Sequence, residues 1–132
     1  AATANPKAAP ILRDVLYIED NPVNLMVVQK MLATRTGISL FTAERPGAGI
    51  ALAQLHHPAL ILLDINLPDM NGFEVLECLR GNPTTSSIPV VAISANAFQA
   101  DIERATKAGF KDYITKPVEK ERLMQVIDQF IS

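Results

Sequence analysis

The sequence contains little that could cross-link or anchor the chain. Cys78 is the only cysteine among 132 residues, so no disulfide can form within the chain. A single cysteine favours a reducing compartment, and we expect the protein to be cytoplasmic. No apolar run approaches the roughly 20 residues of a membrane-spanning helix, and no basic start followed by an apolar stretch marks a secretory signal. Secreted disulfide scaffolds and membrane proteins are therefore disfavoured.

Charge of either sign is not in excess. Lys and Arg number 12 and Asp and Glu number 14, which gives a net charge of −2. This balance offers no electrostatic footprint for nucleic acid or an anionic membrane, so we expect neither as a direct partner. The hydrophobic fraction of 48% and the charged fraction of 20% are ordinary for a soluble globular domain.

The length suits a single domain with its own core. A chain of this size buries roughly two thirds of its unfolded surface on folding, so it needs no staple. The opening lacks an initiator Met, is rich in Ala and Pro and is poor in large apolar residues. We interpret residues 1–10 as a linker stub from a longer protein and residues 11–132 as the folded domain.

Short apolar runs alternate along the chain with segments of helical periodicity. The run 59–63 is apolar throughout, which is typical of a parallel strand buried on both faces. The expected strands are 15–18, 38–42, 59–63, 89–93 and 113–115, and the expected helices are 22–34, 46–56, 72–80, 96–108 and a final segment containing Leu123, Val126, Ile127 and Phe130. The alternation predicts an α/β fold, a doubly wound five-stranded parallel sheet with five helices on its two faces.

Several side chains of the expected helices are assigned to the core. Phe98 is expected on a buried helix face with Ile102 and Ala105. Cys78 is expected to be a small buried or half-buried residue. The methionines expected to fill the core are Met26, Met31 and Met124.

Polar groups follow four of the five expected strands, at the point where each strand ends. They are Glu19 and Asp20, Asp64, Ser94 and Lys116. Because ligands bind outside the carboxyl ends of strands in open parallel sheets, we expect these side chains to gather at one edge. A different reading remains open for Glu19 and Asp20, which could simply cap the first helix, and Asp20 could do both. Asn21 is the other candidate for the cap.

The residue types at this edge suit phosphoryl transfer. Clustered carboxylates repel one another, which raises their pKa values unless a cation is near. A hard divalent ion such as Mg²⁺ takes carboxylate, water and phosphate oxygens as ligands. An Asp can act as a nucleophile and form an acyl phosphate. Lys116 and Ser94 would supply a positive charge and a hydroxyl for the phosphoryl oxygens.

These motifs together resemble the receiver domains of bacterial response regulators in two-component signalling, over about residues 12–131. The matching segments are 18–21, 63–72, 93–95 and 113–117. Each segment alone is a weak signal, but their order and their positions at strand ends are specific. The resemblance implies a flavodoxin-like (βα)5 fold.

The resemblance also implies roles for the residues at the sheet edge. Asp64 would be the phosphoacceptor, and Lys116 and Ser94 would contact the phosphoryl group. Mg²⁺ or Mn²⁺ would be held by Asp20, Asp64, the backbone carbonyl of Asn66, and Glu19 either directly or through water. A metal-dependent phosphoacceptor site is thus expected.

A switch and its partners follow from the same resemblance. Ser94 would move inward on phosphorylation, Tyr113 would change rotamer, and a cis peptide would precede Pro117. The phosphoryl group would come from the phosphohistidine of a histidine kinase or a histidine phosphotransfer domain. The output would be a changed surface on the fourth helix, the fifth strand and the fifth helix. Such a domain assists its own phosphorylation and dephosphorylation but is not a turnover enzyme.

The segments 19–24, 94–97 and 110–113 resemble receivers carried on hybrid sensor histidine kinases. Together with the linker stub, they indicate a receiver module of a larger hybrid kinase, which could be tethered to a membrane. An alternative is a degenerate receiver that acts only as a protein-interaction module, although such domains normally lack an acceptor, a metal ligand or the lysine. A phosphatase with an Asp nucleophile is disfavoured, because such enzymes usually carry a second Asp where this chain has Asn66.

Overall fold

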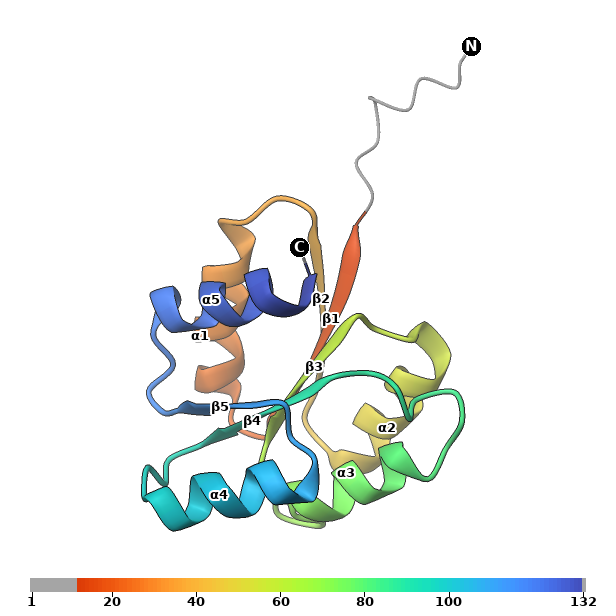
Figure 1. The fold of residues 1–132 in the computed structure, drawn as a ribbon. Coiled ribbons are helices and arrows are strands. Elements are labelled where there is room, and N and C mark those ends of the chain that lie inside the picture. Colours follow the sequence, from red (N-terminus) through yellow and green to blue (C-terminus); the bar gives the residue numbers. More distant parts are fainter. Residues whose placement is uncertain (1–11, 132) are drawn as a thin grey trace.

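The computed structural model describes residues 12–131, which form one parallel sheet of strand order β2-β1-β3-β4-β5 (Figure 1). The strands are β1 (Arg13–Ile18), β2 (Ile38–Ala43), β3 (Leu60–Asp64), β4 (Val90–Ser94) and β5 (Asp112–Thr115), and the helices are α1 (Pro22–Ala33), α2 (Pro46–His56), α3 (Gly72–Arg80), α4 (Gln99–Ala108) and α5 (Lys120–Ile131). The predicted doubly wound α/β fold is confirmed. The linker expected over residues 1–10 lies outside the described residues.

Two hydrophobic layers hold the helices against the sheet. α1 and α5 pack on one face, through side chains such as Val28 and Ile127. α2, α3 and α4 cover the other face, through side chains such as Leu79 and Ala105 (Figure 1). Every residue of β3 and β4 is buried, as expected for apolar strands covered on both sides. All five strands therefore direct their carboxyl ends to one edge.

Helix caps fix two of the loops at that edge. Asn21 Oδ1 accepts a hydrogen bond from Val23 N at 2.8 Å, so Asn21 rather than Asp20 caps α1. α3 starts with a capping box, in which Asn71 Oδ1 accepts from Glu74 N at 3.0 Å and Glu74 Oε1 accepts from Asn71 N at 3.2 Å. These caps set where the chain leaves β1 and where it enters α3.

The predicted burial of Phe98 was wrong. The helix was expected to begin at Asn96, whereas α4 begins at Gln99 and Phe98 is 76% exposed. The preceding loop is held by the backbone of Asn96, whose amide and carbonyl both bind side chains of other residues. Phe98 therefore lies before the first helical turn, where the helical periodicity that suggested burial does not apply.

The predicted burial of Met26 and Cys78 was also wrong. Met26 is 45% exposed and Cys78 is exposed. Their neighbours Leu25 and Leu79 are buried, and a step of one residue turns the side chain by about 100° around a helix, away from the buried stripe. Two methionines are half-buried and pack against the core as predicted, namely Met31 and Met124.

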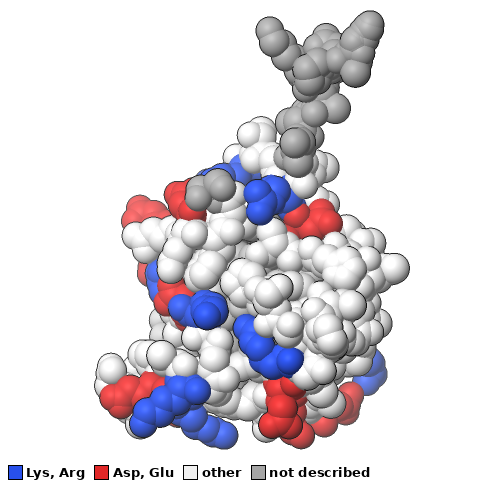
Figure 2. Space-filling view, turned by 45° about the vertical axis from the view of Figure 1, so that its right-hand side comes forward, with Lys and Arg blue, Asp and Glu red and all other residues white. Residues whose placement is uncertain are grey.

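The surface carries both signs of charge. Figure 2 shows acidic and basic side chains interspersed on one face, without a field of a single sign. This distribution agrees with the balanced composition. Within residues 12–131, no helix combines the length and the apolar character that crossing a membrane requires.

Candidate functional site

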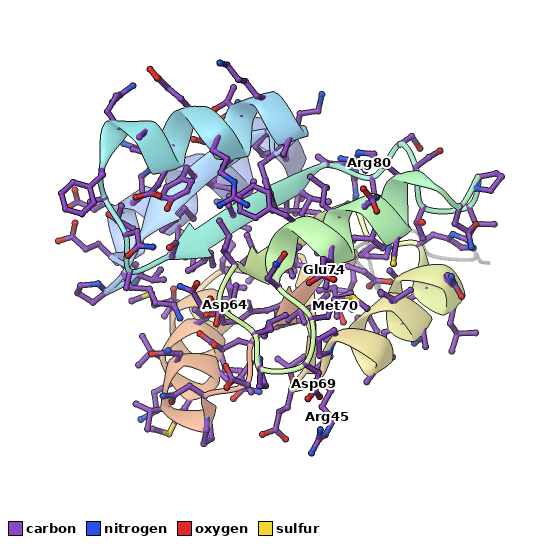
Figure 3. All side chains as sticks on the ribbon, turned by 90° about the horizontal axis from the view of Figure 1, so that it is seen from below. Arg45, Asp64, Asp69, Met70, Glu74 and Arg80 are labelled. Carbon is purple, nitrogen blue, oxygen red and sulfur yellow. The ribbon has the colours of Figure 1, made fainter. Side chains whose placement is uncertain are left out.

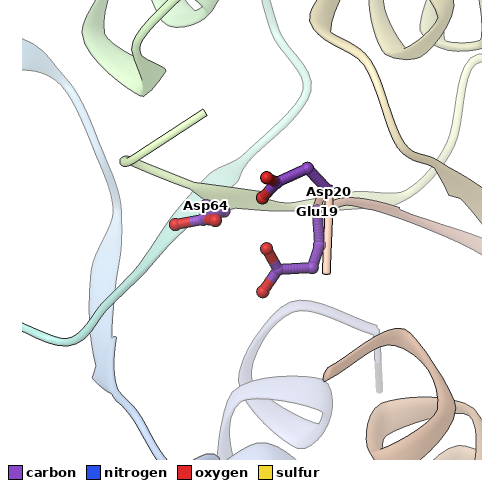
Figure 4. Close-up of side chains that lie close together, drawn as sticks. All are labelled: Glu19, Asp20 and Asp64. Atoms are coloured by element: carbon purple, nitrogen blue, oxygen red, sulfur yellow. The ribbon is translucent and has the colours of Figure 1, made fainter. Parts of the chain in front are cut away.

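Three carboxylates gather at the carboxyl edge of the sheet. Glu19 and Asp20 directly follow β1, Asp64 ends β3, and each offers an oxygen within 4.8 Å of the others (Figure 4). Figure 3 looks onto this edge, with Asp64 at the base of the loop that carries Asp69. Glu19 and Asp64 are 0% and 2% exposed, whereas Asp20 is exposed. The cluster is therefore buried on one side and open to solvent at Asp20.

Lys116 brings a positive charge to the buried side of the cluster. Its Nζ lies 2.9 Å from Glu19 Oε1 and 3.4 Å from Asp64 Oδ2. Lys116 follows β5, and its backbone N donates to Ser94 O at 2.8 Å, which ties this loop to the end of β4. The peptide bond between Lys116 and Pro117 is cis. The structure thus brings the carboxylates and the lysine together, as the strand ends predicted.

Two further side chains bind Glu19, and the sequence reasoning did not assign a role to either. Tyr17 donates its hydroxyl to Glu19 Oε1 at 3.1 Å, and Asn24 Nδ2 donates to the same oxygen at 2.9 Å. The sequence feature that could have indicated the first contact is Tyr17, which stands in the otherwise aliphatic run 15–18, two residues before Glu19. Residues two apart on a strand point to the same face, so the contact follows from the pleat.

The carboxylates differ in their tendency to ionise. Burial raises the pKa of Asp64 to about 6, and the hydrogen bond shared with Glu19 acts in the same direction. Burial would also raise the pKa of Glu19, but hydrogen bonds with Asp64 and Lys116 outweigh it and hold that pKa below its usual value. Burial, and then the charge of Glu19, raise the pKa of Tyr17, so its hydroxyl keeps its proton. As the pH rises, Glu19 therefore ionises before Asp64 and is the first of the two carboxylates to pair with the charge of Lys116.

The loop after β3 packs tightly behind Asp64. Asn66 N donates to Asp64 Oδ1 at 3.0 Å, and Gly72 N donates to Ile65 O at 2.8 Å. A Cβ on Gly72 would lie 2.7 Å from Ile65 Cα and 3.1 Å from Asp64 O, so only glycine fits here without a backbone shift. The part expected of the Asn66 carbonyl in metal binding stays a prediction.

Ser94 and Tyr113 meet at the backbone of one residue. Asn96 N donates to Ser94 Oγ at 3.1 Å, and Tyr113 OH donates to Asn96 O at 2.7 Å. Both side chains are buried, at 1% and 9% exposure. Both also line a cavity of about 80 Å³, together with Asn66 and Arg104. The two residues expected to act as a switch are thus joined through Asn96.

The donor set at this edge suits a hard divalent cation. Carboxylate oxygens are ligands that Mg²⁺ and Mn²⁺ prefer, whereas Zn²⁺ favours nitrogen and sulfur. Among the described residues, the three-carboxylate group contains no His or Cys. A cation beside Asp20 would also relieve the repulsion between the ionised carboxylates.

Comparison with known proteins identifies the family. The family model described as the response regulator receiver domain matches residues 15–128. Protein PilH of Pseudomonas aeruginosa is 32% identical over 118 residues, which cover 89% of this chain and 97% of PilH. The polar-differentiation response regulator DivK of Brucella ovis is 32% identical over 119 residues, which cover 90% of this chain and 96% of DivK.

A solved structure gives the same result. The receiver domain of a sensor histidine kinase from Pseudomonas aeruginosa, determined with a magnesium ion coordinated in its active site cleft, superposes with a TM-score of 0.82 at 29% identity. The match covers 91% of this chain and 98% of that domain. The range matched by the family model contains every strand-end residue described above. This chain belongs to the response regulator receiver domain family of two-component signalling.

Proposed function

We propose that this domain is a phosphoacceptor switch in which Asp64 takes a phosphoryl group from a phosphohistidine. The observation that carries the proposal is the burial of Asp64, at 2% exposure, with Lys116 Nζ 3.4 Å from its Oδ2. An Asp64 oxygen attacks phosphorus while the bond from phosphorus to the imidazole nitrogen breaks. Such a transfer needs positioning and neutralisation of charge. Lys116 would supply positive charge for the phosphoryl oxygens, and Ser94 would supply a hydroxyl that helps to position them.

The proposed metal is Mg²⁺, which Mn²⁺ could replace. Asp20, Asp64, the carbonyl of Asn66, and Glu19 directly or through water would hold it. The oxygen-only donor set supports this assignment, and so does the magnesium ion in the cleft of the similar kinase receiver. When bound, the ion would supply positive charge for the phosphoryl oxygens.

The proposed readout is a change around Ser94 and Tyr113. If Ser94 Oγ turns to the phosphoryl group, its bond with Asn96 N is lost, and Tyr113 is bonded to the same residue. The motion would alter the surface formed by α4, β5 and α5. A surface that differs between two states is what a partner needs in order to tell them apart.

The proposed phosphodonor is a histidine kinase or a histidine phosphotransfer domain. Such a switch takes one phosphoryl group and is restored when the acyl phosphate is hydrolysed, so it is not a turnover enzyme. The resemblance of residues 19–24 to hybrid kinases, and the 29% identity to the receiver of a sensor kinase, support a module within a larger hybrid kinase. If the domain is part of a hybrid kinase, the same polypeptide also contains a kinase core. Phosphotransfer from that core to this domain would then support the proposed context.

The first test is intact mass after incubation with a small-molecule phosphodonor and Mg²⁺. We expect the parent to gain one phosphoryl group, and Asp64→Asn and a sample treated with a chelator to gain none. Asp69→Asn is the matched control, because Asp69 is an exposed carboxylate in the same loop. No gain in a parent that circular dichroism shows to be folded would favour the interaction module.

A further inference from the structure

Tyr17 carries a buried hydroxyl beside the site that the proposed transfer does not use. The residue is 0% exposed within β1, and its ring packs in the layer between the sheet, α1 and α5. A phenylalanine would fill that space equally well. A buried hydroxyl is unfavourable unless it is bonded, and the bond of Tyr17 goes to Glu19 Oε1 at 3.1 Å.

Three donors converge on that single oxygen. Glu19 Oε1 accepts from Tyr17 OH at 3.1 Å, from Asn24 Nδ2 at 2.9 Å and from Lys116 Nζ at 2.9 Å. The donors come from three separate elements, namely β1, α1 and the segment after β5. A carboxylate has about four acceptor sites on its two oxygens. The convergence therefore uses up the accepting capacity of Oε1.

The second oxygen of Glu19 is in a different situation. Apart from the hydrogen bond that Glu19 shares with Asp64 when one of the two carboxyls is protonated, the contact that Oε2 makes among the described residues is with Asn21 N at 3.5 Å, which is long for a hydrogen bond. Glu19 is fully buried, so a further partner of Oε2 has to be a group held within the site itself. Oε2 thus has accepting capacity left when both carboxyls are ionised, in a residue that has one carboxylate oxygen within 4.8 Å of an oxygen of Asp20 and of Asp64.

We propose that Tyr17, assisted by Asn24, is a positioning residue for the cation site. The two side chains hold Glu19 through Oε1, which fixes the carboxylate plane and leaves Oε2 for the metal ion or for a water bound to it. Partners that orient a ligand group typically change metal affinity by about 10-fold or more when removed. The inference rests on the proposed function, since it concerns the cation of that site.

The test is the Kd for Mg²⁺, measured by titration calorimetry on unphosphorylated protein. Tyr17→Phe removes one hydroxyl and keeps the ring, and we expect the Kd to rise about 10-fold. Thr85→Val is the matched control. Thr85 is 0% exposed and donates its hydroxyl to Leu79 O at 2.7 Å, in the loop between α3 and β4. It also loses one buried hydroxyl bond but should keep the parental Kd.

A second variant tests the same role independently, in case Tyr17→Phe fails to fold. Asn24→Ala removes the other uncharged donor to Oε1 from a half-buried position on α1, and should raise the Kd in the same direction. At saturating Mg²⁺, both variants should reach the parental rate of phosphorylation, whereas at low Mg²⁺ they should be slower. A purely structural role would not give that dependence.

The outcomes separate the two proposals. A parent that binds Mg²⁺ with variants that match its Kd within twofold would overturn the positioning role alone. A parent that binds no Mg²⁺ would overturn the proposed metal dependence, and the positioning role with it. A rise in Kd for Thr85→Val as large as that for Tyr17→Phe would assign the effect to general loosening and reject the inference.

Discussion

Lys116 forms its shorter ion pair with Glu19, whose carboxylate is fully buried: Nζ and Oε1 are 2.9 Å apart. The distance from the same Nζ to Asp64 Oδ2 is 3.4 Å. One ammonium group is therefore shared by two buried carboxylates. In the proposed phosphorylation of Asp64, Lys116 would already lie beside the phosphoryl oxygens, and in the unphosphorylated protein we expect it to stabilise the fold.

The shared lysine predicts a large loss of stability on its removal. Lys116→Met leaves two buried carboxylates without their cation, and we expect the free energy of unfolding at pH 7 to fall by about 2 kcal/mol or more. Urea denaturation measures the loss, with the exposed Lys111→Met as the control. The loss should shrink as acid protonates the carboxylates. Equal stability of the two variants at pH 7 would contradict the role of the ion pair.

Asp64 predicts a dependence of stability on pH in the metal-free protein. Its pKa is raised from 3.8 to about 6, so between these values the folded state binds more protons than the unfolded state. This contribution is complete below pH 4 and is lost as the pH rises through about 6. Asp64→Asn stays neutral and should exceed the parent by on the order of 2 kcal/mol at pH 7.5 but little at pH 4.

Denaturation of the parent and of Asp64→Asn at several pH values can also contradict the raised pKa of Asp64. The exposed Asp69→Asn, which loses only a surface ion pair with Arg45, should follow the parent at every pH. An Asp64→Asn variant that is less stable than the parent at pH 7.5 would mean that Asp64 is stabilised, not strained, by ionisation.

The strand ends were predictable because the signal is local. A continuous apolar run marks a strand such as β3, the next polar residue is its end, and a parallel sheet brings such ends to one edge. Asp64 and Lys116 could therefore be assigned to one site although they lie far apart in the sequence. Nothing beyond alternation and parallel pairing is needed for this step.

The hydrogen-bond partners were not predictable in the same way. Whether Tyr17 packs or donates depends on which carboxylate oxygen lies above it, and that is set by α1 and by the segment after β5 together. The exposure of Phe98 has a similar cause, since the start of α4 depends on the bonds that Asn96 makes with Ser94 and Tyr113. Such contacts between distant elements override local periodicity.

The carboxylate cluster predicts that Mg²⁺ stabilises the protein. Binding to the folded state alone adds about 2.7 kcal/mol when the ion is at 100 times its Kd, which should raise the Tm by several degrees, and a chelator should reverse the shift. Asp20→Asn should lose most of this response. Asp14→Asn, which changes the same charge near the other end of β1, should keep it. An equal Mg²⁺ response in the two variants would argue against Asp20 as a ligand.

Gly72 predicts a backbone requirement beside Asp64. Gly72→Ala would press a Cβ to 2.7 Å from Ile65 Cα, so we expect it to destabilise the fold by about 2 kcal/mol and to slow phosphorylation. Gly47→Ala in the first turn of α2 is the matched control, because its Cβ meets nothing within 4 Å. It should be neutral or stabilising by up to about 1 kcal/mol. A Gly72→Ala variant as stable as Gly47→Ala would show that the loop can move away freely.

The bonds at Asn96 predict that Ser94 and Tyr113, the proposed switch residues, respond together. Ser94→Ala removes the acceptor for Asn96 N, and Tyr113→Phe removes the donor to Asn96 O. Because both bonds involve the same residue, a double-mutant cycle should give a coupling energy of about 0.5 kcal/mol or more in the free energy of unfolding. The amide resonance of Asn96 should shift in each single variant and also on phosphorylation of the parent.

The control is Thr106→Val, which removes a hydroxyl that bonds to Ile102 O on an exposed face of α4. Its effect on the free energy of unfolding should add independently to that of Ser94→Ala. Additive effects of Ser94→Ala and Tyr113→Phe, with an unshifted Asn96 resonance on phosphorylation, would mean that Tyr113 only packs and that any switch runs through other residues.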